Sequence, residues 1–211
     1  MNVSKTPVLL SVAYNPPIAW FSLLAKHNVV LESHETYPKQ TFRNRCEIYA
    51  ENGRMPLSIP VSRPKGNHTQ INDVTIVNSD KWYLRHWRAI QSAYESSPYF
   101  LFYKDDLKGF YEGNYEGLFD FNTRLIRTIA GLLNLQTHIR VTDMYEKTPI
   151  AVKDYRNLFN PKKEIQFAVF PEYIQVFSER HGFIPNLSIL DLLFNLGPES
   201  SDYLNHIILP F

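Results

Sequence analysis

A dense polar stretch follows the second apolar segment of the chain. It begins with Glu32-Ser33-His34-Glu35 and continues to Lys39-Gln40-Thr41-Phe42-Arg43-Asn44-Arg45. A carboxylate close to an imidazole fixes the tautomer of the ring and raises its basicity, so Glu32 and His34 could form a general base. In an extended chain the two side chains lie on the same side. A surface histidine beside ordinary acidic residues is the alternative interpretation.

The second half of this stretch is rich in cations and holds no acid. Arg43 and Arg45 share a face if the chain is extended there, and each guanidinium offers a planar fork to phosphate or carboxylate. We therefore expect a site for an anionic small molecule. Its expected binding residues are Lys39, Gln40, Arg43, Asn44 and Arg45. A solvated basic loop that pairs with acids elsewhere is the alternative.

The elements before this stretch predict an N-terminal βαβ unit. The short apolar run Val8–Ala13 is typical of a buried strand, Pro17–His27 has an apolar stripe at helical spacing, and Val29–Leu31 is a second apolar run. Strand, helix and strand in so short a segment indicate a right-handed parallel unit. Ligands of open α/β sheets bind beyond the carboxyl ends of the strands, where the polar stretch begins.

Three further residues belong to the expected binding site. Tyr14 and Asn15 follow the first strand, and Tyr37 lies within the polar stretch. Asn15 is also the expected cap of the following helix, whose N-terminus adds partial positive charge. Tyr14 and Tyr37 could stack on a ligand or hydrogen-bond to it.

The rest of the chain predicts a single α/β domain over residues 1–211, with a mixed, partly parallel sheet flanked by helices. Asn52-Gly53 indicates a β-hairpin at about 45–61, with arms Arg45–Ala50 and Pro56–Val61. Further elements are expected as a strand over Ile71–Val77, a helix capped by Ser79 or Asp80 and ended by Ser96-Ser97-Pro98, a helix over Tyr115–Asn134 and a strand over His138–Thr142. A last helix is expected to be capped by Ser188, with Asp191 completing a capping box and Gly197 and Pro198 ending it. Residues 143–163 are polar and irregular.

Composition excludes several classes of protein. The 211 residues carry 22 Lys and Arg against 21 Asp and Glu, a net charge of +1, which argues against a protein whose main partner is nucleic acid. The apolar run Val8–Ala13 is too short to insert through a membrane. Cys46 is the single cysteine, which excludes an intramolecular disulfide, fits a cytoplasmic protein and predicts a small buried side chain. Lys162-Lys163 is expected to be solvated charge.

Signals for metals and cofactors are missing from the sequence. The histidines form no close-spaced pair of metal ligands, and no G-x-G-x-x-G, Walker-type, G-x-S-x-G or H-E-x-x-H motif occurs. We expect neither a metal nor a cofactor. The sequence does not determine the oligomeric state.

Four ordered blocks of the chain resemble the WbqC-like protein family. They are the stretch from Tyr37 to Arg45, Leu57–Val61 with the later Lys65-Gly66, the segment from Trp82 to Tyr94, and Pro185–Asn195 with Gly197-Pro198. The resemblance implies a role in the biosynthesis of bacterial surface polysaccharide of the O-antigen type. It also implies transfer of glycine or another aminoacyl group to a sugar, with a nucleotide sugar or an activated acyl donor as the anionic substrate.

One block departs from the family pattern. Members usually open with Gln-Pro-x-Tyr-x-Pro, and here Tyr14 and Pro16 match while Ser11 and Val12 stand in place of Gln and Pro. If that Gln contacts substrate in other members, the activity is altered here. A non-catalytic ligand-binding or scaffold protein of the same pathway is therefore the second hypothesis. A nucleotidyltransferase ranks last, because the paired-histidine turn of such enzymes is missing.

Overall fold

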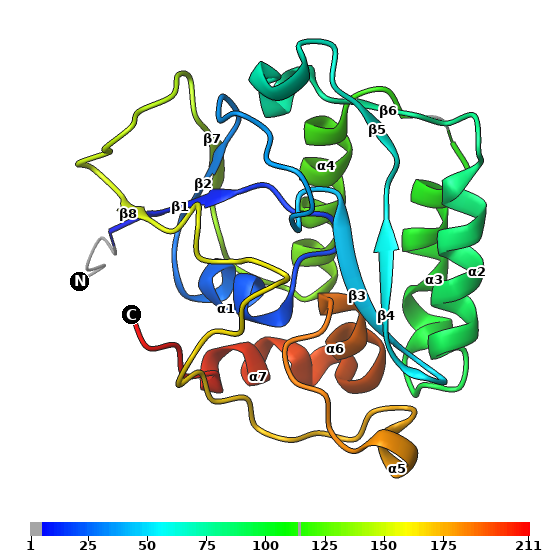
Figure 1. Ribbon diagram of the computed structural model, residues 1–211. Helices are drawn as coiled ribbons and strands as arrows, with labels where there is room; N and C mark the ends of the chain where they lie inside the picture. The colour runs from blue at the N-terminus through cyan, green and yellow to red at the C-terminus, as the bar shows by residue number, and fades with distance from the viewer. Residues whose placement is uncertain (1–5, 114) are drawn as a thin grey trace.

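A parallel four-stranded sheet forms the part of the fold that carries the predicted site. A computed structural model describes residues 6–113 and 115–211. The strand order is β7-β2-β1-β8 (Figure 1), and every neighbouring pair is parallel. The bounds are β1 (Val8–Ser11), β2 (Val29–Glu32), β7 (Ile139–Val141) and β8 (Lys153–Asp154). The expected α/β class with a partly parallel sheet is confirmed.

The predicted βαβ unit is present, with α1 (Ile18–Lys26) between β1 and β2. Leu10 pairs with Leu31 in the register, and both side chains are buried. The expectation that Asn15 caps α1 is wrong. Pro17 stands at the cap position without a capping side chain, because Asn15 lies two residues earlier and its side chain is directed to Tyr111, to whose hydroxyl Nδ2 donates at 2.9 Å.

The predicted hairpin consists of β3 (Arg45–Ala50) and β4 (Gly53–Ser58). Gly53 turns the chain with φ of 93°, a conformation that favours glycine. The second arm begins three residues earlier than expected, so Pro56 lies inside β4 opposite Glu47. This edge strand tolerates a proline, because its outer side has no partner strand to bond.

The strand expected over Ile71–Val77 is largely replaced by a turn. Residues Ile71–Asp73 form the 3₁₀-helix η2, and only β6 (Thr75–Ile76) is extended, where it pairs with β5 (Val61–Ser62). Ile71 and Val74 are both buried. A 3₁₀ turn places residues three apart on the same side, so it buries both, which an alternating strand would not.

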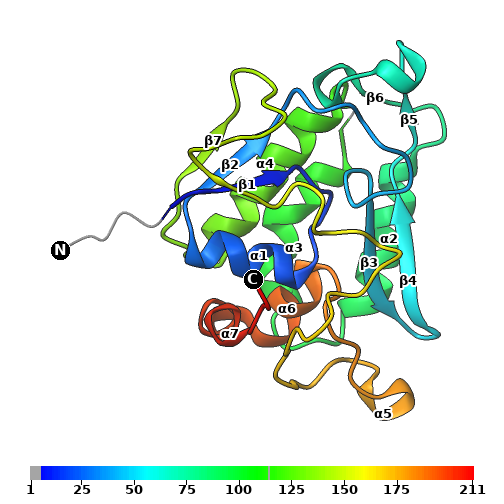
Figure 2. The ribbon, with the colours of Figure 1, turned by 60° about the vertical axis from the view of Figure 1, so that its left-hand side comes forward.

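Helices surround the sheet and the hairpin. Their bounds are α2 (Trp82–Tyr94), α3 (Phe100–Lys108), α4 (Leu118–Leu132), α5 (Ser178–His181), α6 (Ile189–Leu196) and α7 (Ser200–His206). Three further 3₁₀-helices are η1 (Gly66–His68), η3 (Gly109–Tyr111) and η4 (Gly197–Glu199). Figure 2 shows α7 beside α1, and α6 packs against the same helix. No helix in the described part of the chain is both long and apolar enough for a membrane span.

The helix α6 begins and ends as predicted, but it is not the last helix, because η4 and α7 follow it. The Ser188 hydroxyl accepts a hydrogen bond from the Leu190 backbone, and Gly197 ends the helix with φ of 52°. The capping box is wrong, because the Asp191 carboxylate faces inward and accepts hydrogen bonds from Tyr173 and Gln175. It fastens residues 173–175 to α6 instead.

Candidate functional site

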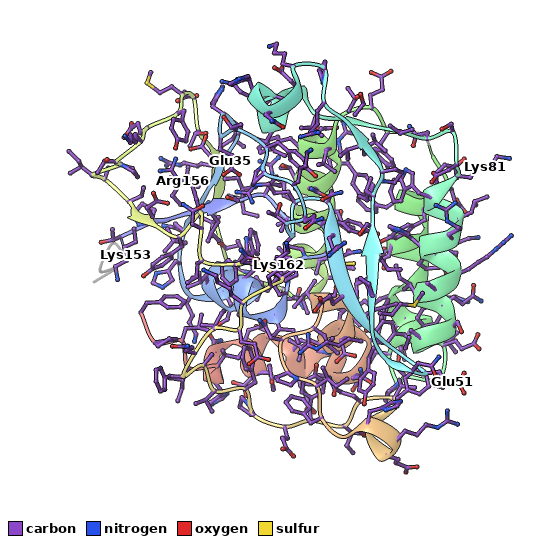
Figure 3. The ribbon with its side chains drawn as sticks, in the orientation of Figure 1. Glu35, Glu51, Lys81, Lys153, Arg156 and Lys162 are labelled. Carbon is purple, nitrogen blue, oxygen red and sulfur yellow. The ribbon has the colours of Figure 1, made fainter. Side chains whose placement is uncertain are left out.

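A buried ion network lies at the carboxyl edge of the parallel sheet. Because the four strands run in the same direction, their last residues meet at one edge, and Ser11, Glu32 and Asp154 end β1, β2 and β8. Figure 3 labels Glu35 and Arg156 at this edge. The predicted polar stretch therefore does follow the strand end at which ligands of α/β sheets bind.

Glu35 and Arg43 form the first half of this network. The guanidinium donates from Nε to Oε1 at 2.7 Å and from Nη2 to Oε2 at 2.6 Å, a bidentate pair. Both residues are buried, with 7% and 5% of their surface exposed. Ser11 Oγ accepts from Arg43 Nη2 at 2.6 Å and lies 3.0 Å from both Glu35 Oε2 and the Arg156 carbonyl, to which it can donate.

Arg156 forms the second half and joins three segments. Its Nη1 donates to Glu32 Oε2 at 2.9 Å, and its Nε and Nη2 donate to the two oxygens of Asp154 at 2.9 and 2.6 Å. The hydrogen bonds from Arg156 hold the pKa of Asp154 below its ordinary value. The guanidinium also lies 4.9 Å from the centre of the Tyr145 ring, a cation–π distance. Arg156 is not among the residues that the sequence patterns predicted for the site.

This network changes the role expected of Arg43. The Glu35 carboxylate already accepts hydrogen bonds from the Arg43 guanidinium, which was expected to bind phosphate. Two guanidinium groups face three carboxylates, those of Glu32, Glu35 and Asp154, so the cationic charge is fully compensated. In this structure Arg43 holds the edge of the sheet together and does not present a vacant anion site.

Glu32 fixes the backbone at His34 and not its imidazole. Glu32 Oε1 accepts from the His34 backbone N–H at 2.8 Å and from the Thr142 hydroxyl at 3.0 Å. The expected extended course is wrong here, because the chain bends at His34 and Glu35 after β2 ends. The His34 side chain is partly exposed at the edge. The hydrogen bond from the His34 backbone N–H to Glu32 holds the imidazole at this position.

Tyr14, Asn15 and Tyr37 are buried, so none of the three side chains faces solvent. The Tyr14 hydroxyl lies 2.8 Å from His86 Nδ1 and donates to the Tyr111 hydroxyl at 3.3 Å. Burial lowers the pKa of His86 to about 4 and raises the pKa of Tyr37 to about 12. The side chains of Tyr14, Asn15, His86 and Tyr111 therefore form an internal polar cluster of uncharged groups.

Four predicted residues remain around the loop before the hairpin. Lys39 and Gln40 are exposed, and Gln40 has a left-handed φ of 56°. The Asn44 amide donates to the Ile59 carbonyl at 2.8 Å, which ties the loop to the residue after β4. Arg45 is partly exposed on the outer face of the hairpin, where its Nε donates to Ser58 Oγ at 3.1 Å. Lys39, Gln40 and Arg45 are thus accessible from solvent.

A cavity of about 310 Å³, here called the crossover cavity, lies beneath the connection from β7 to β8. Parallel strands are normally joined by a helix, but residues 142–152 form a loop over the sheet face that carries Leu9 and Val30. The charged residues that line the cavity are Glu32, Arg140, Asp143 and Glu146. Ser33 bonds Thr142 through both its backbone N–H and its hydroxyl, so the cavity wall adjoins the chain at His34. In the sequence, the polar and irregular pattern of residues 143–163 was the signal that could have indicated this loop and its cavity.

A scan against protein-family models matches the chain to the WbqC-like protein family over residues 12–158 and 157–203. A relative among curated proteins is the uncharacterized protein Rv1507c of Mycobacterium tuberculosis. It is 27% identical over an alignment 228 positions long, which covers 96% of this chain and 98% of that protein. No solved structure matches the chain. The matched residues include the charged members of the ion network, Glu32, Glu35, Arg43, Asp154 and Arg156, and the chain belongs to the WbqC-like protein family.

Proposed function

We propose that this protein is a cytoplasmic transferase of bacterial surface-polysaccharide biosynthesis, which moves an aminoacyl or other acyl group onto a sugar. The observation that carries the proposal is the position of His34. It is partly exposed at the carboxyl edge of the parallel sheet, and its backbone is bonded to the wall of the crossover cavity through Glu32. The family resemblance and the single cysteine support the pathway and the compartment.

His34 would act as the general base of the reaction. Its imidazole takes a proton from the amine or hydroxyl of the acceptor sugar, whose nitrogen or oxygen then attacks the acyl carbon. The new carbon–nitrogen or carbon–oxygen bond replaces the bond to the leaving group of the donor. The bonding electron pair departs with that group, which receives the proton from His34. The acidic side chains of the crossover cavity suit an amino sugar, because an ammonium group pairs with carboxylates.

The experiment is product formation from nucleotide-activated amino sugars and acyl or aminoacyl donors, followed by mass spectrometry. A well-placed base contributes roughly 10²–10⁴ in rate, so His34→Ala should lower kcat by about that factor with little change in substrate binding. His206→Ala is the matched control, because this histidine is exposed on α7, which packs on α1 and α6. An unchanged rate for His34→Ala would remove the assignment of the base.

A non-catalytic ligand-binding or scaffold protein of the same pathway is the second candidate. The observation that favours it is Ser11, which stands where family members usually have Gln and whose hydroxyl is engaged by Glu35, Arg43 and the Arg156 carbonyl. This candidate predicts donor binding without product. A nucleotidyltransferase would instead consume a nucleoside triphosphate and release pyrophosphate, which the same reactions report.

A further inference from the structure

A second cavity, here called the hairpin cavity, lies where three distant segments of the chain meet. Its volume is about 430 Å³, within the usual range of small-molecule sites. The outer face of the β3–β4 hairpin forms one wall, residues 159–170 form the next, and residues 185–186 close it. Phe42, from the predicted binding stretch, also lines this cavity. It is separate from the crossover cavity, with which it shares no lining residue.

The frame of the hairpin cavity is fixed by internal bonds. Arg54 donates from Nη1 to Glu47 Oε2 and from Nη2 to the Pro185 carbonyl, both at 2.8 Å. The side-chain oxygen Oδ1 of Asn186 accepts a hydrogen bond from the Ala19 backbone N–H at 2.9 Å. These contacts join the hairpin, the segment before α6 and the first turn of α1. The Glu47 carboxylate neutralises the positive charge of Arg54.

Two cations at the cavity have no such partner. Lys162 and Lys163 lie in a turn in which both backbone N–H groups bond to Asn160, at 2.9 and 3.0 Å. Across the described residues, neither ammonium group lies within ion-pair distance of a carboxylate. Figure 3 shows Lys162 near the centre of the molecule's face, away from Lys81 and Lys153 at its two sides. Glu164 also lines the cavity, so its charged residues are three cations (Arg54, Lys162 and Lys163) and two carboxylates (Glu47 and Glu164), and the net positive charge attracts an anion to the lysine pair.

Apolar rings stand beside these cations. Phe42, Phe159 and Phe170 line the cavity and are only partly buried by the protein. Partly exposed phenyl rings are surfaces on which a nucleobase can stack. The combination of rings and unpaired ammonium groups suits a ligand that has one flat part and one strongly anionic part.

We propose that the hairpin cavity binds the nucleoside diphosphate part of the nucleotide-activated sugar. The phosphates lie against Lys162 and Lys163, and the base lies on the phenylalanine rings. This assignment deepens the proposed function and rests on it for the identity of that sugar substrate. The assignment gives a binding role to Lys162 and Lys163, which the sequence pattern presents as solvated charge. It also gives one to Phe42, which lies within the stretch that was expected to bind an anion.

Isothermal titration calorimetry with UDP, ADP and inorganic pyrophosphate tests the assignment. We expect UDP or ADP to bind the wild-type protein, and the variant Lys162→Gln/Lys163→Gln to raise its Kd by at least about tenfold through loss of charge-assisted hydrogen bonds. Phe42→Leu should weaken the nucleotide several-fold and leave pyrophosphate unchanged. The control Lys81→Gln/Lys153→Gln removes the same charge at distant, exposed positions and should leave Kd unchanged. A urea midpoint for each variant shows whether it is folded.

Three results would overturn the assignment. They are an unchanged Kd in Lys162→Gln/Lys163→Gln, an equal loss in Lys81→Gln/Lys153→Gln, and no binding of either nucleotide to the wild type. A failure of the proposed function would give a different combination of transfer and binding results. Transfer activity with normal KM for the nucleotide-activated sugar in the lysine variant rejects the hairpin cavity and keeps the transferase. Lysine-dependent nucleotide binding without any transfer product keeps the hairpin cavity and rejects the transferase.

Discussion

Replacing Arg156 with methionine tests the energetics of the ion network. The substitution retains an unbranched apolar side chain and removes the guanidinium from Glu32, which is 0% exposed. Breaking a buried ion pair by removing one partner costs about 3–5 kcal/mol, because the remaining charge stays desolvated. Asp154 is partly exposed and contributes little to this cost, and the contact with Tyr145 adds about 0.5–1 kcal/mol. We therefore expect Arg156→Met to lower the free energy of unfolding by about 3–5 kcal/mol.

Urea unfolding followed by tryptophan fluorescence measures this loss as a lower midpoint at constant slope. The matched control is Arg180→Met, whose ion pair with Glu51 has side chains 61% and 70% exposed and should contribute about 0–1 kcal/mol. Adding Glu32→Gln to Arg156→Met should restore part of the stability, since the second change removes the unpaired charge. The reasoning is refuted if Arg156→Met costs no more than Arg180→Met.

Two further changes address other buried groups. Burial raises the pKa of Asp191 from 3.8 to about 6, so the folded state binds this proton more tightly than the unfolded state, and about 2 kcal/mol of stability should be lost as the pH rises from 4 to 7. We expect Asp191→Asn to flatten this dependence in urea midpoints measured across that range, and an unaltered slope would contradict the assignment. Tyr14→Phe leaves the buried Nδ1 of His86 without its partner at 2.8 Å and should cost about 1–3 kcal/mol in the same unfolding assay. A cost below about 0.5 kcal/mol would show that His86 finds another partner.

Local patterns predicted the elements whose signals are short-range. The apolar run at Val8, the proline before α1 and Asn52-Gly53 each define their own segment through periodicity or turn chemistry, and the βαβ unit and the hairpin follow from them. Ser188 likewise caps α6 through a bond to its own helix. The position of the polar stretch beyond β2 was also predictable, since it depends only on where the strand ends.

Partners that are distant in sequence were not predictable. Glu32 and Arg156 are 124 residues apart, and nothing in either neighbourhood says that one neutralises the other. The strand β8 has two exposed residues and no apolar pattern, so only its pairing with β1 defines it. For the same reason the sequence could not show that Lys162 borders a cavity with Phe42.

The binding of an anionic donor is most directly tested by a thermal-shift series on the wild-type protein with nucleotide sugars, nucleotides, coenzyme A and amino acids. A ligand at 100 times its Kd adds about 2.7 kcal/mol, which for a chain of this size corresponds to a rise in Tm of roughly 5–11 °C. We predict such a rise for a nucleotide sugar or an activated acyl donor, and a smaller one in Lys162→Gln/Lys163→Gln. No rise with any of these anions would contradict the account and direct the search to a protein partner.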